Sequence, residues 1–519
     1  MLVSTGQIAF ILLAALLLAC ASAWALARRY RSAMRRLMSA PATLAVDDAA
    51  PIGDPEAAQT RSPPFAASFA DNRRAAARLT LWLGVMSVLI AASSATLWLL
   101  LAFPGEPFAP KRAAVLALMH LWPVIPAIGL MHRWSWPRLL GALALWVLFC
   151  FAVMLWRSIE PRPLELLLAL AVEIGPGLAI VALIFGHSAT RAAAPWLLPL
   201  FMLLMWVSMA GVDVLALLVE RRSPWIASLP GWLGAPAVIA LFALLPWLLA
   251  WWPVQRLGRW LARAYARKQL SDLMVMFGSV WAISQLLQAL SVASHAGVAG
   301  IAMLLPLAWV PLAMAIYARA QAAPAHPPTL LVLRVFQHDA QVQALFDHVI
   351  ERWRLSGPTV LIAGTDLADR TLDADDLFVF LDGDLASRFI RTPAEVPLRL
   401  AAFDPTPDAD RRYRVNECYC HDSTWQHALR ALVHRSDVVL MDLRGFQARN
   451  AGCVFELETL ARAPRPLRVV VLIDGTTDRA AAAEAAAGAP PGRFHWVETP
   501  LAGAAPQRAV LPHLFGAAA

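Results

Sequence analysis

The stretch "RSDVVLMDLRGFQARNAGCVFELETL", residues 435–460, has the pattern of a buried strand, a polar loop and an amphipathic helix. An apolar run with two adjacent valines ends at Asp442, which is typical of a strand that is covered on both faces. Glu456 then falls one turn or so into the expected helix. The two carboxylates can take part in chemistry, or they can serve only as a strand end and as a favourable charge near a helix N-terminus.

Apolar runs and helical periodicities alternate through the whole C-terminal region. The expected strands cover 329–336, 358–364, 436–443, 467–474 and 494–498, and the expected helices cover 343–357, 424–435, 450–463 and 477–487. An additional strand is expected in "DLFVFLDG", residues 376–383. Near-continuous apolar strands that alternate with helices predict a mostly parallel, doubly wound sheet.

Ligands bind to such sheets beyond the carboxyl ends of the strands. The loops there read "QHDAQ", "TDLADRTLDADD", "LRGFQARNAGC" and "GTTD", and they begin at residues 337, 365, 443 and 475. Asp366 and Asn450 in these loops are candidate ligand-binding residues. Arg444 is a candidate for a phosphate, because a guanidinium donates two hydrogen bonds to one anionic group. The alternative for Arg444 is an ordinary surface arginine.

The composition indicates a membrane protein. The chain has 519 residues, of which 59% are hydrophobic and 21 are tryptophan, and this is too apolar for an ordinary soluble enzyme. Residues 329–519 hold 20 arginines against 24 acidic residues, so the net charge of +8 arises from the N-terminal half. We expect this basic excess to set membrane orientation and do not expect nucleic acid as a partner.

Apolar runs long enough to cross a bilayer recur about nine times. They cover 7–27, 79–103, 113–131, 139–156, 164–186, 194–219, 229–252, 272–292 and 298–318. Threading these spans with the N-terminus outside places most Lys and Arg residues of the loops in the cytoplasm. The bias towards Arg and Ala suggests a GC-rich bacterial genome. We therefore expect a multi-pass protein of the bacterial inner membrane with a cytoplasmic C-terminus.

The expected spans and the α/β pattern divide the chain into five segments. They are an N-terminal anchor helix (1–28), a disordered cytoplasmic loop (29–78), a polytopic membrane domain (79–319), a linker (320–328) and a cytoplasmic α/β domain (329–519). In "QRLGRWLARAYARKQ", residues 255–269, four arginines recur at spacings of three and four. This pattern favours an interfacial helix that faces anionic headgroups, with a specific lipid or partner site as the alternative.

Two acidic residues fall inside expected spans. Glu173 lies near the middle of one span and Asp213 lies in the next, with no basic residue close to it in sequence. Acids in a membrane usually face a bundle interior and mark a proton or ion path. A single protonated carboxyl that serves packing alone is the equal alternative.

The residues of the opening stretch carry a family resemblance. "SDVVLMDL" followed by "GCVFELETL" resembles the third strand and following helix of TIR domains, where Cys453, Glu456 and Leu457 match a C-x-x-E-L helix start and Gly452 replaces the usual Trp. Asp442, Gly452 and Glu456 also resemble the structurally similar nucleoside 2-deoxyribosyltransferases. The resemblance covers about residues 329–475. "LRVFQHDAQ" approximates the start of a TIR domain with Phe336 and Asp339 but lacks its usual Ser.

The resemblance implies a site for NAD or a related nucleotide as substrate. Glu456 would hold the ribose and support cleavage of the bond to the base, and Asp442 would assist. Phe336, Asp339 and Gly452 would contact the ligand. A carboxylate beside the ribose stabilises the positive charge that such cleavage creates. The family also implies self-association of the α/β domain.

Three functions remain open from the sequence. The first is a membrane-anchored signalling or defence protein that binds and cleaves NAD or a related nucleotide. The second is a non-enzymatic module that senses nucleotides or binds proteins and is coupled to the membrane bundle. The third is a regulated transporter, although no internal repeat supports it.

Several other chemistries are excluded or disfavoured. The only lysines are Lys111 and Lys268, so the C-terminal region cannot use a phosphate-binding or Schiff-base lysine. Dinucleotide, P-loop and zincin motifs do not occur, and no bound cofactor is expected. "NECYCHD", residues 416–422, has a C-x-C-H spacing that does not suit zinc. We expect no metal, and we expect both thiols on one buried face of an extended segment.

Overall fold

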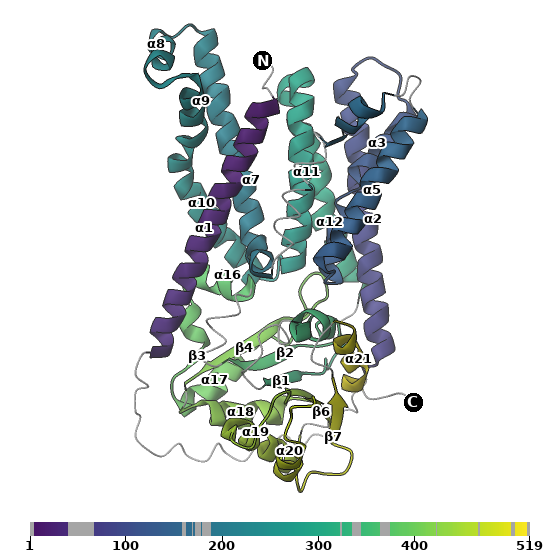
Figure 1. The fold of residues 1–519 in the computed structure, drawn as a ribbon, viewed down its shortest axis with the longest axis vertical. Helices are drawn as coiled ribbons and strands as arrows, with labels where there is room; N and C mark the ends of the chain where they lie inside the picture. Colours follow the sequence, from purple (N-terminus) through teal and green to yellow (C-terminus); the bar gives the residue numbers. More distant parts are fainter. Residues whose placement is uncertain are drawn as a thin grey trace. The chain divides into compact units, whose positions relative to one another are not determined.

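The computed structural model describes residues 5–39, 67–157, 162–168, 170–171, 178, 188–321, 324–334, 344–363, 374–421, 423–465, 468–499 and 504–515. The chain forms two compact units, each built from three separate segments (Figure 1). The helical unit comprises residues 1–30, 80–317 and 372–382. The α/β unit comprises residues 31–79, 318–371 and 383–519.

Apolar helices make up the described part of the helical unit. They are α1 (Thr5–Ser39), α2 (Phe69–Ala102), α3 (Pro110–His120), α4 (Val124–Met131), α5 (Trp136–Arg157), α7 (Ser188–Glu220), α8 (Pro224–Leu233), α9 (Ala235–Leu244), α10 (Pro246–Ala266), α11 (Asp272–Ala296), the 3-10 helix η2 (Gly297–Ala308) and α12 (Trp309–Ala320). Eight stretches of the described residues are long and apolar enough to cross a membrane. Most of the predicted span 164–186 lies outside these residues.

The predicted span 113–131 is divided into two helices. α3 ends at His120, and α4 starts at Val124 with Pro123 as its N-cap residue. Proline has no backbone N–H and its ring obstructs the preceding turn, so a helix does not continue through it easily. The break therefore has a local cause in the sequence.

The segment predicted as an additional strand is a helix. α16 (Ala374–Asp382) belongs to the helical unit, although strands of the α/β unit precede and follow it in sequence. Its Phe378 packs in an apolar cluster with Leu261 and Tyr265 of α10, and the Phe378 and Tyr265 ring centroids are 4.9 Å apart. The short run "LFVFL" suits a strand or a helix. Only a helix places Phe378 and Leu381 on the same side of the segment, where both pack against α10.

The α/β unit contains a seven-stranded parallel sheet. Its strands are β1 (Leu330–Arg334), β2 (Thr359–Ala363), β3 (Phe389–Ile390), β4 (Val415–Cys420), β5 (Val438–Asp442), β6 (Arg468–Ile473) and β7 (Phe494–Glu498). The order across the sheet is β3-β4-β2-β1-β5-β6-β7, and every pair is parallel. The chain adds strands on one side of β1 and then, from β5, on the other. The strand order thus reverses between β1 and β5.

Helices cover both faces of this sheet. On one face, α17 (Val396–Ala401), α18 (Trp425–Arg435), α19 (Ala451–Arg462) and α20 (Arg479–Ala485) pack on a continuous core that includes Met441 and Val471. On the other, α21 (Ala504–Leu514) contacts β5, β6 and the helical turns η3 (Phe346–Ile350), which continue into α14 (Glu351–Trp353). Successive strand residues point to opposite faces, so apolar strands need both coverings.

Two parts of the chain differ from the sequence expectation in extent. Helix α1 continues to Ser39 and α2 begins at Phe69, so both ends of the predicted loop 29–78 are helical, and residues 40–66 lie outside the described ones. The first turns of α2 belong to the α/β unit, where the Asn72 amide donates to the carbonyl of Arg352 at 2.7 Å and to Ser356 Oγ at 2.8 Å.

The segment around the two neighbouring cysteines is strand β4. Cys418 and Cys420 are both buried on one face of the strand, with their sulfur atoms 3.8 Å apart. This confirms the expectation of an extended segment with both thiols on one buried face.

Candidate functional site

Strand β5 delivers Asp442 to the carboxyl edge of the sheet, next to β1. The carboxylate does not stand free there, because both of its oxygens bind Arg444: Nε donates to Oδ1 at 2.7 Å and Nη2 donates to Oδ2 at 2.5 Å. The backbone N–H of Arg444 also donates to Oδ1 at 3.2 Å. The pair is almost fully buried. Asp442 is therefore the counter-ion that orients Arg444 in this structure.

The third nitrogen of the Arg444 guanidinium, Nη1, does not bind Asp442. Nη1 is buried and has no hydrogen-bond partner in the described part of the chain. An unpaired buried donor on a charged group costs about 1–3 kcal/mol or more. A ligand oxygen placed against Nη1 would remove this cost, so the prediction that Arg444 binds an anionic group has a geometric basis.

The loop from β5 to α19 is held by Asn450. Its Oδ1 accepts a hydrogen bond from the Gln447 N–H at 2.8 Å, and Asn450 is the N-cap residue of α19. Gly452 follows in the exposed first turn, where an added Cβ would meet only the far end of the Trp425 ring, at 3.9 Å. Asn450 thus shapes the loop, and Gly452 leaves the start of α19 open to solvent.

Glu456 lies in the second turn of α19 and is only 8% exposed. Its Oε2 is buried without a hydrogen-bond partner in the described chain. Burial raises the pKa of Glu456 to about 8. The nearby Cys453 thiol has its pKa raised to about 12 by burial and by the Glu456 charge. An unpartnered carboxyl in this position is held mainly in its neutral form at neutral pH.

The loop after β6 adds a residue that the sequence did not identify as a site residue. Asp474 Oδ1 accepts hydrogen bonds from the N–H of Gly445 (3.2 Å) and from the hydroxyls of Thr476 (2.8 Å) and Thr477 (3.0 Å). Burial acts to raise the Asp474 pKa, but these hydrogen bonds outweigh it and lower the pKa below its usual value. The other oxygen, Oδ2, is buried and has no hydrogen-bond partner among the residues that the structure describes.

The loops after β5 and β6 are joined by these contacts. Thr477 Oγ1 donates to the carbonyl of Leu443 at 3.0 Å, and the Gln447 amide donates to the carbonyl of Thr476 at 2.9 Å. The signal in the sequence was the run "DGTT" after a strand, since Asp, Ser and Thr side chains often bind backbone groups in turns. The carboxyl edge therefore holds three buried polar atoms without a partner in the described part of the chain, and hydrogen bonds join the two loops that carry Arg444 and Asp474.

Other predicted site residues fall outside the described part of the chain. Phe336 and Asp339 follow β1, Asp366 follows β2, and Glu173 belongs to the expected fifth span. Asp213 is described, and it lies exposed on α7 at the surface of the helical unit. The structure thus brings Asp442, Arg444, Asn450, Gly452 and Glu456 to one edge.

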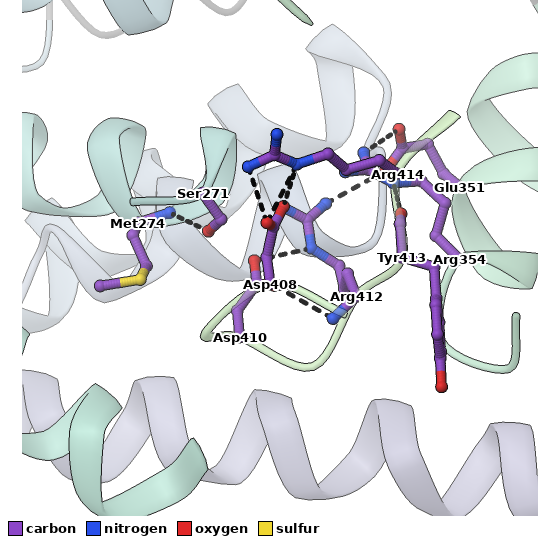
Figure 2. A network of polar contacts seen from close by, with 9 residues as sticks. All are labelled: Ser271, Met274, Glu351, Arg354, Asp408, Asp410, Arg412, Tyr413 and Arg414. Carbon is purple, nitrogen blue, oxygen red and sulfur yellow. Dashed lines mark hydrogen bonds and ion pairs between the residues drawn. The ribbon is translucent and has the colours of Figure 1, made fainter. Parts of the chain in front are cut away.

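The opposite, amino-terminal edge of the sheet holds a different group of charges (Figure 2). Arg414 binds Asp408 through Nε at 3.0 Å and Nη2 at 2.8 Å, and Arg412 Nε donates to Asp410 at 3.0 Å. Glu351 accepts from Arg354 at 2.9 Å and from Arg412 at 3.3 Å. Burial raises the pKa of Asp408 to about 6 although Arg414 opposes this.

This network lies where β2 and β4 begin, since the N–H of Thr359 donates to the carbonyl of Arg414 at 3.3 Å. Its three carboxylates are matched by three guanidiniums. Neither edge offers a metal site: in the described ranges, no three His, Cys, Asp or Glu side chains are grouped so that they could hold an ion. The paired network is therefore a structural element of the fold.

Comparisons with known proteins add no assignment. No protein-family model matches the chain, and no curated protein or solved structure matches it at a significant level.

Proposed function

We propose that the α/β unit binds NAD or a related nucleotide at its carboxyl edge and cleaves the N-glycosidic bond, with Glu456 as the catalytic residue. The observation that supports this most is the buried, unpartnered Oε2 of Glu456 together with its pKa of about 8. A functional acid or base commonly has a pKa shifted towards neutrality by burial. The TIR-like sequence around Glu456 agrees with this role.

The chemistry follows from the charge of the substrate. In NAD the nicotinamide carries a positive charge, so it leaves as a neutral base with the bonding electrons and needs no proton. The sugar C1′ becomes cationic and is captured by water, which loses a proton. A cationic ribosyl group next to Glu456 would lower its pKa, and the ionised carboxylate would then stabilise the developing charge.

Arg444 and Asp474 have complementary roles in this proposal. The free Nη1 of Arg444 would bind a phosphate oxygen of the dinucleotide, with Asp442 holding the guanidinium in place. Asp474 Oδ2 would accept a hydrogen bond from a ribose hydroxyl. Such contacts position the scissile bond without taking part in its cleavage.

The test measures nicotinamide release from NAD by the full-length chain, reconstituted at high density in nanodiscs so that the proposed self-association can occur. We expect Glu456→Gln to lower turnover at least about a thousandfold, because the charge stabilisation is lost. Glu458→Gln is the matched control, since Glu458 lies on the same helix and pairs with Arg462 at 3.2 Å on the surface. Equal turnover by Glu456→Gln and the native chain would contradict the proposal.

The pH profile separates NAD from a neutral nucleoside as substrate. Cleavage of NAD requires ionised Glu456 and should rise as the pH approaches 8. A neutral nucleoside needs its base protonated, so the same residue would act as an acid and the rate should fall over this range.

A non-enzymatic, nucleotide-sensing α/β unit is the second candidate. It is favoured by the neutral form of Glu456 and by the closed Asp442–Arg444 pair, which together suit binding better than catalysis. Saturable NAD binding by the full-length chain without nicotinamide release, abolished by Arg444→Met, would select this function.

We further propose a membrane-anchored signalling or defence role in the bacterial inner membrane. The proposal adds the predicted span 164–186 to the eight candidate spans, which gives nine and places the N-terminus outside and the α/β unit in the cytoplasm. A C-terminal reporter that is active only in the cytoplasm tests this directly. An active periplasmic reporter at the same position would require an even number of spans.

A further inference from the structure

Helix α10 has two faces of opposite character in its C-terminal half. One face is covered, where Leu261, Ala262 and Tyr265 are buried in the cluster completed by Phe378 of α16. The other face is exposed and carries two tryptophans and four arginines. We call it the α10 basic face, and its residues are Trp252, Arg256, Arg259, Trp260, Arg263 and Arg267.

The helix period places these six residues together. At 3.6 residues per turn they occupy an arc of roughly 100° on the side opposite Leu261. Among the described residues, only one of these arginines, Arg263, has an acidic partner, and that contact is long. Arg256 stacks over the Trp252 ring at 3.5 Å, Arg263 lies 3.9 Å from Asp382, and Arg259 makes only a 3.5 Å contact with the backbone carbonyl of Gln255. The face therefore keeps most of its positive charge.

The length of the helical stretch places this face at the level of lipid headgroups. The candidate span runs from Ala235 to Ala266, 32 residues, which is about 48 Å at 1.5 Å per residue. The hydrocarbon core of a bilayer is only about 30 Å thick. The last ~16 Å, from Arg256 onwards, therefore lies beyond the hydrocarbon.

The composition of the face matches that environment. Tryptophan is enriched where hydrocarbon meets headgroups, and arginine directly beyond it binds anionic lipid phosphates. Trp24 and Arg28 of α1 repeat the arrangement, with the guanidinium 5.4 Å from the ring centroid. A soluble anion would have no use for the exposed indoles of Trp252 and Trp260, whereas a lipid has both an acyl chain and a phosphate.

We propose that the α10 basic face is a binding surface for anionic phospholipids, whose phosphates contact Arg256, Arg259 and Arg267 while the tryptophans pack on the upper acyl chains. The proposal is independent of any activity of the α/β unit. Arg259 and Arg267 are the residues to change, because neither takes part in a ring contact or an ion pair between described residues.

The experiment titrates the full-length chain in detergent with phosphatidylglycerol or phosphatidylcholine and counts bound lipids by native mass spectrometry. We expect the native chain to prefer phosphatidylglycerol and Arg259→Gln/Arg267→Gln to lose about fivefold in affinity per arginine. Arg221→Gln/Arg222→Gln is the matched control, because it removes two exposed arginines that directly follow the C-terminal end of α7, away from the α10 basic face in sequence. The control should bind phosphatidylglycerol like the native chain.

Three results would overturn the proposal. The first is equal binding of the two lipids by the native chain, and the second is equal loss of phosphatidylglycerol affinity in the control variant. The third is displacement of phosphatidylglycerol by excess inorganic phosphate at constant ionic strength, which would identify a site for free anions. Unchanged melting temperatures of both variants would show that the exposed substitutions leave the fold intact.

Discussion

The two edges of the parallel sheet differ in how fully their buried carboxylates and guanidiniums are paired. At the amino edge, Asp408, Asp410 and Glu351 are each paired with an arginine at 3.3 Å or less. At the carboxyl edge, Arg444, Glu456 and Asp474 each have one buried polar atom with no partner among the described residues. A buried charge is tolerable when it is paired and costly when it is not. Under the proposed function, the amino edge is completed by the fold and the carboxyl edge would be completed by the nucleotide.

Substitutions in the amino-edge network should cause the greatest loss of stability. Arg414→Ala would leave Asp408 buried without its counter-ion, and we expect the full-length chain to lose about 3–5 kcal/mol. Thermal unfolding in detergent measures the loss. Arg462→Ala, which removes an exposed pair with Glu458, should cost at most about 1 kcal/mol. Similar losses for the two variants would show that the amino-edge network is not structural.

At the carboxyl edge, the buried Glu456 carboxyl should make the free energy of unfolding depend on pH. The folded pKa of Glu456 is about 8, against 4.5 for the free side chain. The folded chain therefore binds this proton more tightly, and the stabilisation that is complete below pH 4.5 is lost as the pH rises through 8. Between pH 6 and 8 the loss should be about 2 kcal/mol.

Glu456→Gln should abolish this part of the pH dependence, because the amide does not titrate. Unfolding of the native and variant chains over pH 6–8 makes the comparison. Parallel curves would mean that Glu456 is already ionised at pH 6. Added NAD should make the native curve flatter between pH 6 and 8, since its cationic nicotinamide ribosyl group beside Glu456 would favour the charged carboxylate and lower its pKa.

The smallest expected effect concerns the connection between the loops. Thr477→Val removes the hydroxyl that donates to Leu443 and accepts from the Asp474 N–H at 3.0 Å. We expect a stability loss of about 1–2 kcal/mol together with weaker NAD binding. Thr459→Val is a control of the same shape, because its hydroxyl only donates to the Phe455 carbonyl within α19. An unchanged NAD affinity in Thr477→Val would show that the loop connection does not support the site.

Much of the sheet could be predicted because its strands are nearly continuous apolar runs. β5, β6 and β7 and the helices α18, α19 and α20 appear where periodicity placed them, within a few residues. β3 has only two residues, and β4 begins with polar residues, so neither had a clear pattern. α16 was predicted wrongly as a strand, since contacts with α10 decide its conformation and these are distant in sequence.

The position of the candidate site could be predicted better than its individual hydrogen bonds. The location of Glu456 follows from the lengths of the strand, the loop and the helix. Whether its Oε2 has a hydrogen-bond partner depends on the positions of the surrounding side chains. The bidentate contact between Asp442 and Arg444 depends on side-chain rotamers, which a sequence pattern does not predict. The loops that follow β1 and β2 carry Phe336, Asp339 and Asp366, and they lie outside the described residues.

Segments of the two units alternate along the chain, and this limits how the gene can be recombined. No single cut of the chain separates the units, because each contains three segments interrupted by the other. A fragment that starts at residue 325 would lack Asn72, which binds Arg352 and Ser356, and would expose the apolar side of α16. A single crossover within the gene therefore cannot exchange one complete unit for another.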